Sequence, residues 1–341
     1  MQVKPVKKKA GKFWLYGPTI LLILLAVGWS AGWFYLRDKA VETLDRQIAR
    51  EGAMGRNWTC ANRSIGGFPF RYELNCEPLL LRNGPVSFQF GKTSFISQVY
   101  DPKHVIIVSS GPLRAGDGTM SIAADWQALE ASIILDGTRP EQISVSLTKP
   151  SFTVTDHTLT EPVAFSSDGA DFHLRPTPGS PETDNSFDLA FNSAGTVIPM
   201  LNAWMGDNEP VDISSEITVT KFEALKGRSI PEVLEAWRSG GGLLKIEKLH
   251  TMKGLRALNF RGYGGIDLLH RAEAKLELSQ ANYSDLMARL LSSDRSSEPL
   301  RPVSPGAANS LLVPLPQVQL KNGKVYVGPL AIPGVRLPAL Y

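Results

Sequence analysis

The hydrophobic pattern of the chain changes once, near residue 56. From Phe13 to Leu36 the chain carries no charged residue and has no polar face at helical spacing. From Trp58 onward, apolar and polar residues alternate in short segments such as 68–75, 87–90 and 143–148. The first pattern predicts a helix that is apolar all round, and the second predicts antiparallel strands with one buried face each.

The apolar run is long enough to cross a bilayer. As a helix its 24 residues would reach about 36 Å, against roughly 30 Å of hydrocarbon. We therefore expect residues 13–36 to be a membrane anchor. The alternative is a cleaved signal peptide, whose apolar region is shorter and ends at a pair of small residues. Ser30-Ala31-Gly32 matches such a site weakly, but the run continues past it to Leu36.

Charge predicts how the anchor is oriented. Acidic residues are absent before the run, and the lysines there are Lys4, Lys7, Lys8, Lys9 and Lys12. The positive-inside rule then makes residues 1–12 a cytoplasmic basic tail and places the rest of the chain outside the cytoplasm. Val41, Leu44 and Ile48 keep helical spacing, which predicts a helical neck over residues 37–56 and a β-rich body over 57–341.

Within the body, strands outnumber helices. Val105 to Val108 is a continuous apolar run and predicts a more buried strand, and an Asn322-Gly323 turn precedes another alternating segment. Ser229 and Glu232 have capping-box spacing and predict a helix through Trp237 that ends at Gly240. Two further helices are expected over 196–205 and 282–291. Because strands and helices do not alternate regularly, the predicted fold class is mainly β (α+β), with a large antiparallel sheet.

Two proline-containing stretches, 175–186 and 292–310, are typical of loops. The first either divides the body into two halves or connects strands within one sheet.

Two cysteines, Cys60 and Cys76, are the only ones in the chain. The expected topology puts both in an oxidising space, where a disulfide is the natural state. If residues 66–70 form a five-residue hairpin loop, position 60 lies directly opposite position 76, within bridging distance. A metal pair or a redox pair is the alternative, and neither has support, because the chain has no CxxC and no histidine lies near either cysteine.

No motif of catalysis, metal binding or cofactor binding stands in a credible context. Gly28 to Gly32 reads as GxSxG but lies inside the apolar run, and Ser146 to Lys149 reads as SxxK on an expected strand, where Ser and Lys point to opposite faces. Asp156 and His157 are more typical of a solvated strand end than of an acid–base pair. The net charge of +3 is smaller than the N-terminal lysines alone supply, so the body offers no basic block for nucleic acid. We expect no enzyme and no cofactor.

The segment between the cysteines carries a resemblance. Arg63-Ser64-Ile65-Gly66-Gly67-Phe68-Pro69-Phe70-Arg71-Tyr72-Glu73-Leu74, bracketed by Cys60 and Cys76, resembles the signature of a bacterial envelope family called domain of unknown function 2125. Val99 to His104 and Leu320 to Pro338 resemble two further segments of that family. The resemblance implies an inner-membrane protein of a Gram-negative bacterium with a periplasmic body. The order of features also resembles AsmA-like envelope proteins, which implies a curved sheet.

We interpret the residues of this hairpin as structural rather than catalytic. Gly66 and Gly67 permit a tight turn, whereas Phe68, Phe70 and Tyr72 are expected in the core. Pro69 lies between the two phenylalanines, and Arg71 is expected to form an ion pair on the solvent face.

Two functions from different classes fit the sequence. In the first, the curved sheet leaves part of its apolar face open and binds or passes phospholipid or another envelope lipid in envelope maintenance. In the second, the protein is an anchored scaffold that binds another envelope protein and holds no ligand. The shape of the β-body decides between them, because an open apolar face favours lipid and a sealed core favours a scaffold.

Overall fold

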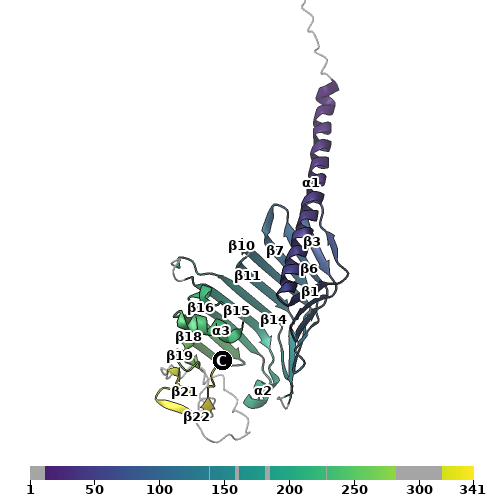
Figure 1. The fold of residues 1–341 in the computed structure, drawn as a ribbon. Coiled ribbons are helices and arrows are strands. Elements are labelled where there is room, and N and C mark those ends of the chain that lie inside the picture. The colour runs from purple at the N-terminus through teal and green to yellow at the C-terminus, as the bar shows by residue number, and fades with distance from the viewer. Residues whose placement is uncertain (1–11, 138, 158–160, 181–184, 228, 282–316) are drawn as a thin grey trace, which may run out of the picture.

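The computed structural model describes residues 12–137, 139–157, 161–180, 185–227, 229–281 and 317–341 (Figure 1). The described part contains a long N-terminal helix, α1 (Lys12–Ala53), followed by an antiparallel β-body. Two short helices, α2 (Pro199–Met205) and α3 (Ile230–Ser239), and a 3-10 turn, η1 (Phe222–Ala224), interrupt the strands. The helix expected at 282–291, the loop expected at 292–310 and the lysines Lys4, Lys7, Lys8 and Lys9 lie outside the described residues.

Helix α1 joins the expected anchor and neck in one continuous helix of 42 residues. Its N-terminal part extends away from the β-body, and its C-terminal part lies against the body (Figure 1). By length and composition the helix can cross a membrane, a property that it shares with signal sequences. The apolar side chains from Ile20 to Leu25 are all more than half exposed in the described part of the chain.

The strands form two antiparallel sheets. The short sheet has seven strands in the order β1-β4-β5-β8-β9-β12-β13. Their bounds are Arg56–Cys60 (β1), Leu79–Asn83 (β4), Val86–Phe90 (β5), Leu113–Gly116 (β8), Met120–Asp125 (β9), Ser151–Asp156 (β12) and Val163–Ser166 (β13).

The long sheet has fifteen strands, β2-β3-β6-β7-β10-β11 and then β14 to β22 in chain order. Their bounds are Ser64–Gly66 (β2), Arg71–Cys76 (β3), Thr93–Gln98 (β6), Asp101–Ser109 (β7), Ala128–Asp136 (β10), Arg139–Thr148 (β11), Gly169–Pro176 (β14), Phe187–Thr196 (β15), Val211–Val219 (β16), Leu244–Lys253 (β17), Arg256–Ile266 (β18), Ala272–Ala281 (β19), Val318–Lys321 (β20), Lys324–Val327 (β21) and Leu330–Arg336 (β22).

The two sheets meet along a crease, because the chain repeatedly crosses between them through two or three residues. The crossings are residues 61–63, 77–78, 91–92, 110–112, 126–127, 149–150 and 167–168. Backbone hydrogen bonds link neighbouring crossings, among them Gly91 N to Pro112 O at 3.0 Å and Ser167 N to Pro150 O at 2.9 Å. The two sheets are therefore the arms of one folded sheet, and the crease holds them together.

A row of buried residues follows this crease. Cys76, Thr93, Ser109, Ala170 and Ser193 lie at the crease ends of the long-sheet strands, and all are buried. Hydroxyls in this row satisfy one another, as in the 3.0 Å contact between Thr93 Oγ1 and Ser109 Oγ. Small and hydroxyl side chains suit this position because the two arms approach each other most closely there.

Helix α3 lies where its capping residues predict it, whereas α2 begins later than the sequence predicts. The Ser229 hydroxyl accepts a hydrogen bond from Glu232 N and caps α3, as the capping-box spacing predicts. Trp237 is buried on the inner side of α3, and its indole donates to Thr220 O at 2.8 Å. The helix expected at 196–205 begins only at Pro199, because Thr196 belongs to β15 and pairs with Val211.

One expectation about a strand changes, and one open alternative about a loop can be compared with the strand pairing. Val105 to Val108 lies in β7, but Val108 is exposed, because its side chain is on the opposite face from Ile107. Of the stretch 175–186, the first two residues end β14 and the others connect it to β15, and these strands pair with each other in the long sheet. It therefore joins neighbouring strands within one sheet.

Candidate functional site at the apolar inner face

One face of the long sheet carries a continuous cross-strand row that is apolar except for Ser215. Cross-strand partners continue from β2 to β19 without a change of face, so each side chain in the row has its neighbours on the adjacent strands. The row is Ile65, Leu74, Phe95, Ile107, Ala131, Val145, Phe172, Phe191, Ser215, Leu249, Phe260 and Leu278. Twelve strands at about 4.8 Å spacing give this row a length of about 53 Å. We call this side of the sheet the inner face.

The opposite side of the same strands is polar. The row next to the apolar one is Ser64, Asn75, Ser94, Val108, Glu130, Ser146, Asp171, Asn192, Ser214, His250 and Asn259. Val108 is its one apolar member. We call this side the outer face, and its composition indicates contact with water.

The short sheet contributes a matching apolar face. One of its cross-strand rows is Leu79, Phe90, Leu113, Ala124, Phe152 and Phe165. The rings of Phe152 and Phe165 stack at 5.1 Å. Leu79 and Ala124 are buried at the crease, on the same side as the buried residues of the long sheet. The apolar faces of both arms therefore face the inside of the fold.

The inner face is only half covered away from the crease. A second apolar row lies one step farther from the crease and consists of Ile133, Ile143, Leu174, Leu189, Ile217 and Ile246. All six side chains are half-buried. A sealed core would bury most of such side chains almost completely, so the described residues do not seal this part of the inner face.

A cavity of about 440 Å³ lies where the inner face meets α1. Leu44 and Ile48 of α1 form one wall of this mouth pocket, Trp58 and Leu79 of the short sheet form a second, and Leu74 and Phe95 of the long sheet form a third. The lining also includes Cys60 and Cys76. Cavities of a few hundred Å³ with apolar linings are typical of small-molecule sites.

Two charged side chains line the mouth pocket, Glu51, which pairs with Arg56, and Arg63. Arg63 Nη1 donates to Asp45 Oδ1 of α1 at 2.6 Å. Its Nη2 is buried and has no hydrogen-bond partner among the described residues. A buried guanidinium nitrogen without a partner costs free energy, and an anionic group that enters the pocket would satisfy it.

Cys60 and Cys76 lie at disulfide distance and join the two sheets at the crease. Their geometry differs from the hairpin that the sequence suggested. The ladder pairs Gly66 with Glu73, and the same register continues as the pair Cys60 with Leu79 in the short sheet. Cys60 and Cys76 therefore do not face each other within one ladder, because the chain crosses from β3 to β4 between residues 76 and 79. The bridge fastens one arm to the other beside the mouth pocket.

An aromatic junction holds the β2–β3 hairpin against α1. Trp33 is buried and stacks on Tyr72 at 5.5 Å, and Phe34 stacks on Phe68 at 5.8 Å. The indole of Trp33 donates to Arg71 O at 3.3 Å, and the indole of Trp29 donates to Pro69 O at 3.0 Å. Both indoles thus satisfy backbone carbonyls of the hairpin turn.

The prediction that Phe68 and Phe70 lie in the core is wrong. Strand β3 begins only at Arg71, so residues 67–70 form a turn beyond the sheet. Phe68 is 49% exposed and Phe70 is 63% exposed, and their covered surface packs on α1. Tyr72 is half-buried as part of the inner face, and Arg71 pairs with Glu73 at 3.0 Å on the exposed side, as expected.

We predict that Gly67→Ala destabilises the hairpin, whereas Gly66→Ala leaves it nearly unchanged. Gly67 has φ of +100°, and a Cβ there would lie 2.5 Å from Arg71 O. A Cβ added at Gly66 would meet nothing within 4 Å beyond its chain neighbours. The strained backbone should cost about 1–3 kcal/mol. Denaturant unfolding of the two variants measures the difference, and equal midpoints would contradict this account of the turn.

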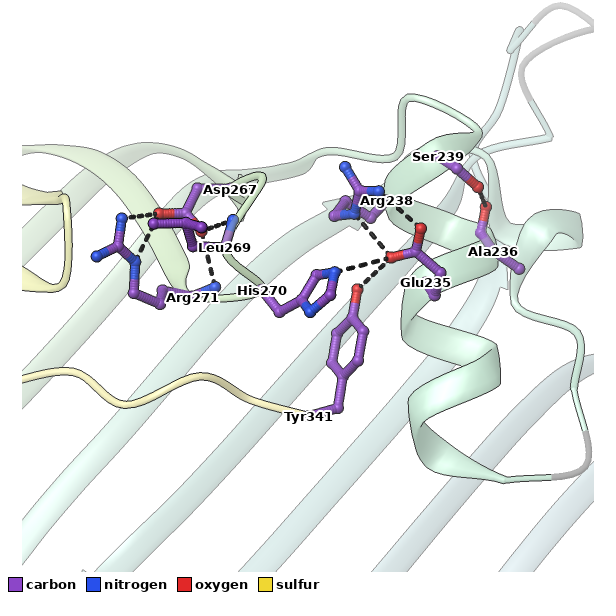
Figure 2. A network of polar contacts seen from close by, with 9 residues as sticks. All are labelled: Glu235, Ala236, Arg238, Ser239, Asp267, Leu269, His270, Arg271 and Tyr341. Atoms are coloured by element: carbon purple, nitrogen blue, oxygen red, sulfur yellow. Dashed lines mark hydrogen bonds and ion pairs between the residues drawn. The ribbon is translucent and has the colours of Figure 1, made fainter.

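The described residues also contain one cluster of ionisable side chains around α3. Figure 2 shows Glu235 of α3 between Arg238, His270 and Tyr341. Arg238 binds both carboxylate oxygens of Glu235, at 2.8 and 2.6 Å, and Tyr341 Oη donates to Oε2 at 2.8 Å. The His270 ring stacks on Tyr341 at 4.5 Å, and Leu340 N donates to His270 O.

The chemistry of this cluster fits a latch better than a catalytic site. The hydrogen bonds from Arg238, and then from Tyr341, lower the pKa of Glu235 to about 2. A carboxylate with both oxygens occupied and so low a pKa is a poor general acid or base near neutral pH. The cluster fastens the segment that ends at Tyr341 to α3.

We predict that this latch persists in mild acid. The pKa of Glu235 is lower in the folded state than in the unfolded state, where it is about 4.3. The stability that this carboxylate contributes is therefore fully present above that unfolded value and is lost as the pH falls toward about 2. The difference in melting temperature between the native chain and Glu235→Gln should stay constant above pH 5 and vanish near pH 2. Tyr341→Phe keeps the ring and should show a smaller difference, and a difference that does not change with pH would contradict the prediction.

The short catalytic patterns do not assemble into a site. Gly28 to Gly32 is helical within α1, and Ser146 lies on the outer face of β11. His157 is exposed and lies 3.8 Å from its neighbour Asp156 at the end of β12. Among the described residues, no group of three or more His, Cys, Asp or Glu side chains gathers as a metal site would require.

One buried cluster gave no signal in the sequence. Lys253, at the end of β17, is 2% exposed, and its Nζ lies 2.7 Å from Asp207 Oδ1. Nζ also donates to Asn202 Oδ1 at 2.8 Å, and Arg256 Nη1 lies 2.7 Å from Asp207 Oδ2. A lysine directly before a turn at Gly254 is expected to contact water. The tertiary fold instead places α2 and the 206–210 segment over Lys253.

An apolar N-terminal helix, a β-body folded into two arms and an inner face open beside that helix define a class of helix-tethered β-proteins. The chain belongs to the family described as uncharacterised protein conserved in bacteria, domain of unknown function 2125, whose model matches residues 33–335. Comparisons with curated proteins and with solved structures gave no match. The match begins at Trp33, so it includes the neck and the aromatic junction except Trp29, but not most of the apolar run.

Proposed function

We propose that this protein is a membrane-anchored periplasmic protein that binds acyl chains of phospholipid along its inner face, in the maintenance of the cell envelope. The observation that carries the proposal is the apolar row of about 53 Å, with half-buried neighbours, that begins beside α1. We propose no catalytic role. A scaffold without a ligand is the alternative that the experiment below distinguishes.

The length of the inner face supports a path rather than a single pocket. One leaflet of a bilayer is about 15 Å of hydrocarbon, so the row exceeds the length of one chain in a leaflet several-fold. Its side chains are aliphatic and phenylalanine with few polar atoms, which suits acyl chains of any length and gives little selectivity between them.

The mouth pocket supports an anionic lipid. It combines apolar walls with the buried Nη2 of Arg63, and a phosphate at this nitrogen would supply the missing acceptor. Its place between α1 and both arms puts it at the end of the inner face nearest the anchor.

The contacts of α1 support the proposed anchor, and the charge of the N-terminus supports the proposed periplasmic location of the body. The helix continues unbroken from the apolar run into the neck, and Trp33 and Phe34, beyond the weak cleavage pattern at 30–32, pack on the hairpin. Cleavage there would remove Trp29 from the body and would abolish its hydrogen bond to Pro69 O. The basic N-terminus favours a periplasmic body, in which the cysteines would be oxidised.

A matched pair on β15 tests lipid binding. Phe191 and Asn192 are consecutive, with Phe191 on the inner face and Asn192 on the outer face. Phe191→Arg places a charge among the acyl chains and should reduce the phospholipid that co-purifies with the full chain from mild detergent at least several-fold. Asn192→Arg should leave it unchanged. Native mass spectrometry measures bound lipid, and thermal unfolding verifies that both variants fold. Equal lipid in the two folded variants, or none with the native chain, would favour the scaffold.

A further inference from the structure

The hairpin turn and a neighbouring tyrosine expose large aromatic side chains beside the apolar part of α1. Phe68, Phe70 and Tyr100 are 49%, 63% and 75% exposed. Val99 N donates to Phe70 O, so Tyr100 lies next to the turn. We call Phe68, Pro69, Phe70 and Tyr100 the aromatic tip. Soluble surfaces rarely cluster such side chains unless they contact a partner or a membrane.

The contacts with α1 set the level of the aromatic tip. Trp29, which binds Pro69 O and packs on Phe70 at 6.3 Å, precedes the first charge after the apolar run, Arg37, by eight residues. At about 1.5 Å per residue the tip therefore reaches about 12 Å back along the apolar run. Any bilayer that surrounds this run must also meet the tip.

The chemistry at that level fits the membrane interface. The indoles of Trp29 and Trp33 have carbonyl acceptors in the hairpin, so their polar atoms need no water. The guanidinium of Arg37 lies over the rings of Trp33 and Phe34, at 5.9 and 5.3 Å, and marks the side that faces water. Aromatic side chains followed by arginine are typical of the boundary between hydrocarbon and headgroups.

A shallow apolar cavity of about 370 Å³ continues this surface along the helix. Leu24, Gly28, Trp29 and Gly32 of α1 and Val99 line it. Apart from chain neighbours and the helix's own backbone, no described atom lies within 4 Å of the position that a Cβ would take at Gly28 or Gly32, so this side of the helix is open. An acyl chain of the surrounding leaflet would cover it.

We propose that the aromatic tip inserts into the leaflet on the body side of the membrane and gives the body a second membrane contact beside the anchor. The occupant of this surface is the bilayer itself, because the tip is continuous with the apolar surface of α1. Insertion fixes the tilt of the body and holds the end of the inner face that carries the mouth pocket toward the membrane. The proposal rests on the anchoring part of the proposed function but not on lipid at the inner face.

Nitroxide labels in the full chain, reconstituted into phosphatidylcholine–phosphatidylglycerol vesicles, test the insertion. The labelled variants are Phe70→Cys and Tyr100→Cys, with Leu268→Cys as the control. Leu268 is 85% exposed and follows β18, far from α1 in the chain order of the long sheet. The native cysteines stay bridged, so each variant carries one label. We expect oxygen to relax the labels at 70 and 100 at least five times more effectively than a water-soluble nickel chelate, and the reverse at 268.

Equal nickel access at 70 and 268 would overturn the proposal. Protection of 70 from both reagents in native membranes would also overturn it, because this result indicates a protein partner. A lipid-soluble carbene reagent on the unlabelled chain provides a second measurement, with modification expected at 68–70 and 100 but not at 268. Insertion without lipid at the inner face would refute only the proposed lipid binding, and lipid at the inner face with a water-exposed tip would refute only the insertion.

Discussion

Asp207→Ala should destabilise the protein by about 3–5 kcal/mol, more than any other single change considered for this chain. The carboxylate of Asp207 lies 2.7 Å from both Lys253 Nζ and Arg256 Nη1. Lys253 is almost completely buried, so loss of the carboxylate leaves its ammonium group with neutral acceptors only. An ionised amine without a counter-charge in such a place is far less stable than one in water.

Glu42→Ala is the matched control, because it breaks an exposed ion pair. Glu42 and Lys39 of α1 lie 2.9 Å apart, and both side chains are more than half exposed. Surface pairs contribute little, so the unfolding midpoint should hardly change. Denaturant unfolding in detergent measures both variants. If Asp207→Ala also left the midpoint unchanged, the buried cluster would not hold α2 and the 206–210 segment to the long sheet.

Replacement of both cysteines by alanine should cost about 3 kcal/mol. Cys60 and Cys76 are separated by 16 positions in the chain, and a cross-link of this span restricts the unfolded state by about that amount. The loss has a local consequence as well, because both residues line the mouth pocket and join the two arms there. We expect the crease beside α1 to open first.

Reductant provides the control for this prediction. It should lower the melting temperature of the native chain toward that of the Cys60→Ala/Cys76→Ala variant and leave the variant unchanged. Hydrogen exchange should increase most in β1 and β3. If the native chain reacted with a thiol reagent without reductant, the cysteines would not be bridged in the cell envelope, and the expected stabilisation would be absent.

Much of the architecture could be predicted from local pattern. The uncharged run from Phe13 predicts α1, and the capping residue Ser229 predicts α3, because each depends on neighbours within one or two turns. Period-two alternation in residues 143–148 predicts a strand with one apolar face, and Ile143 and Val145 do lie on the inner face. The antiparallel class follows from the same alternation.

The division into two arms could not be predicted in the same way. Alternation predicts that a strand has one apolar face. It does not predict which strand is its neighbour, or that from β2 to β13 the chain crosses to the other sheet after every second strand. The register of Cys60 shows this limit, because its ladder partner Leu79 lies beyond a crossing. Pro78 and Pro112 at the crossings mark breaks between strands, yet many turns contain proline as well.

The sequence pointed to the kind of candidate site but not to its position. A β-rich body with few helices left two alternatives, an apolar face that stays partly open and a sealed core, and the second apolar row of the inner face is half-buried in the structure. Phe68 and Phe70 show what alternation cannot reveal. They continue the apolar positions of Tyr72 and Leu74, so they read as core, but the strand begins after them and the covering surface is α1. Only the packing of a distant helix on the turn decides this.

Photocrosslinking in growing cells tests the central claim, lipid on the inner face, most directly. p-Benzoylphenylalanine replaces Phe172, Phe191 or Phe260 on the inner face, and Asp171, Asn192 or Asn259, the adjacent residues in the chain, on the outer face. Cells are grown with radioactive phosphate and irradiated. The account predicts radioactive phospholipid attached to the purified chain at all three inner positions and at none of the outer ones. Equal labelling of the two sets, or no labelling at the inner positions, would contradict it.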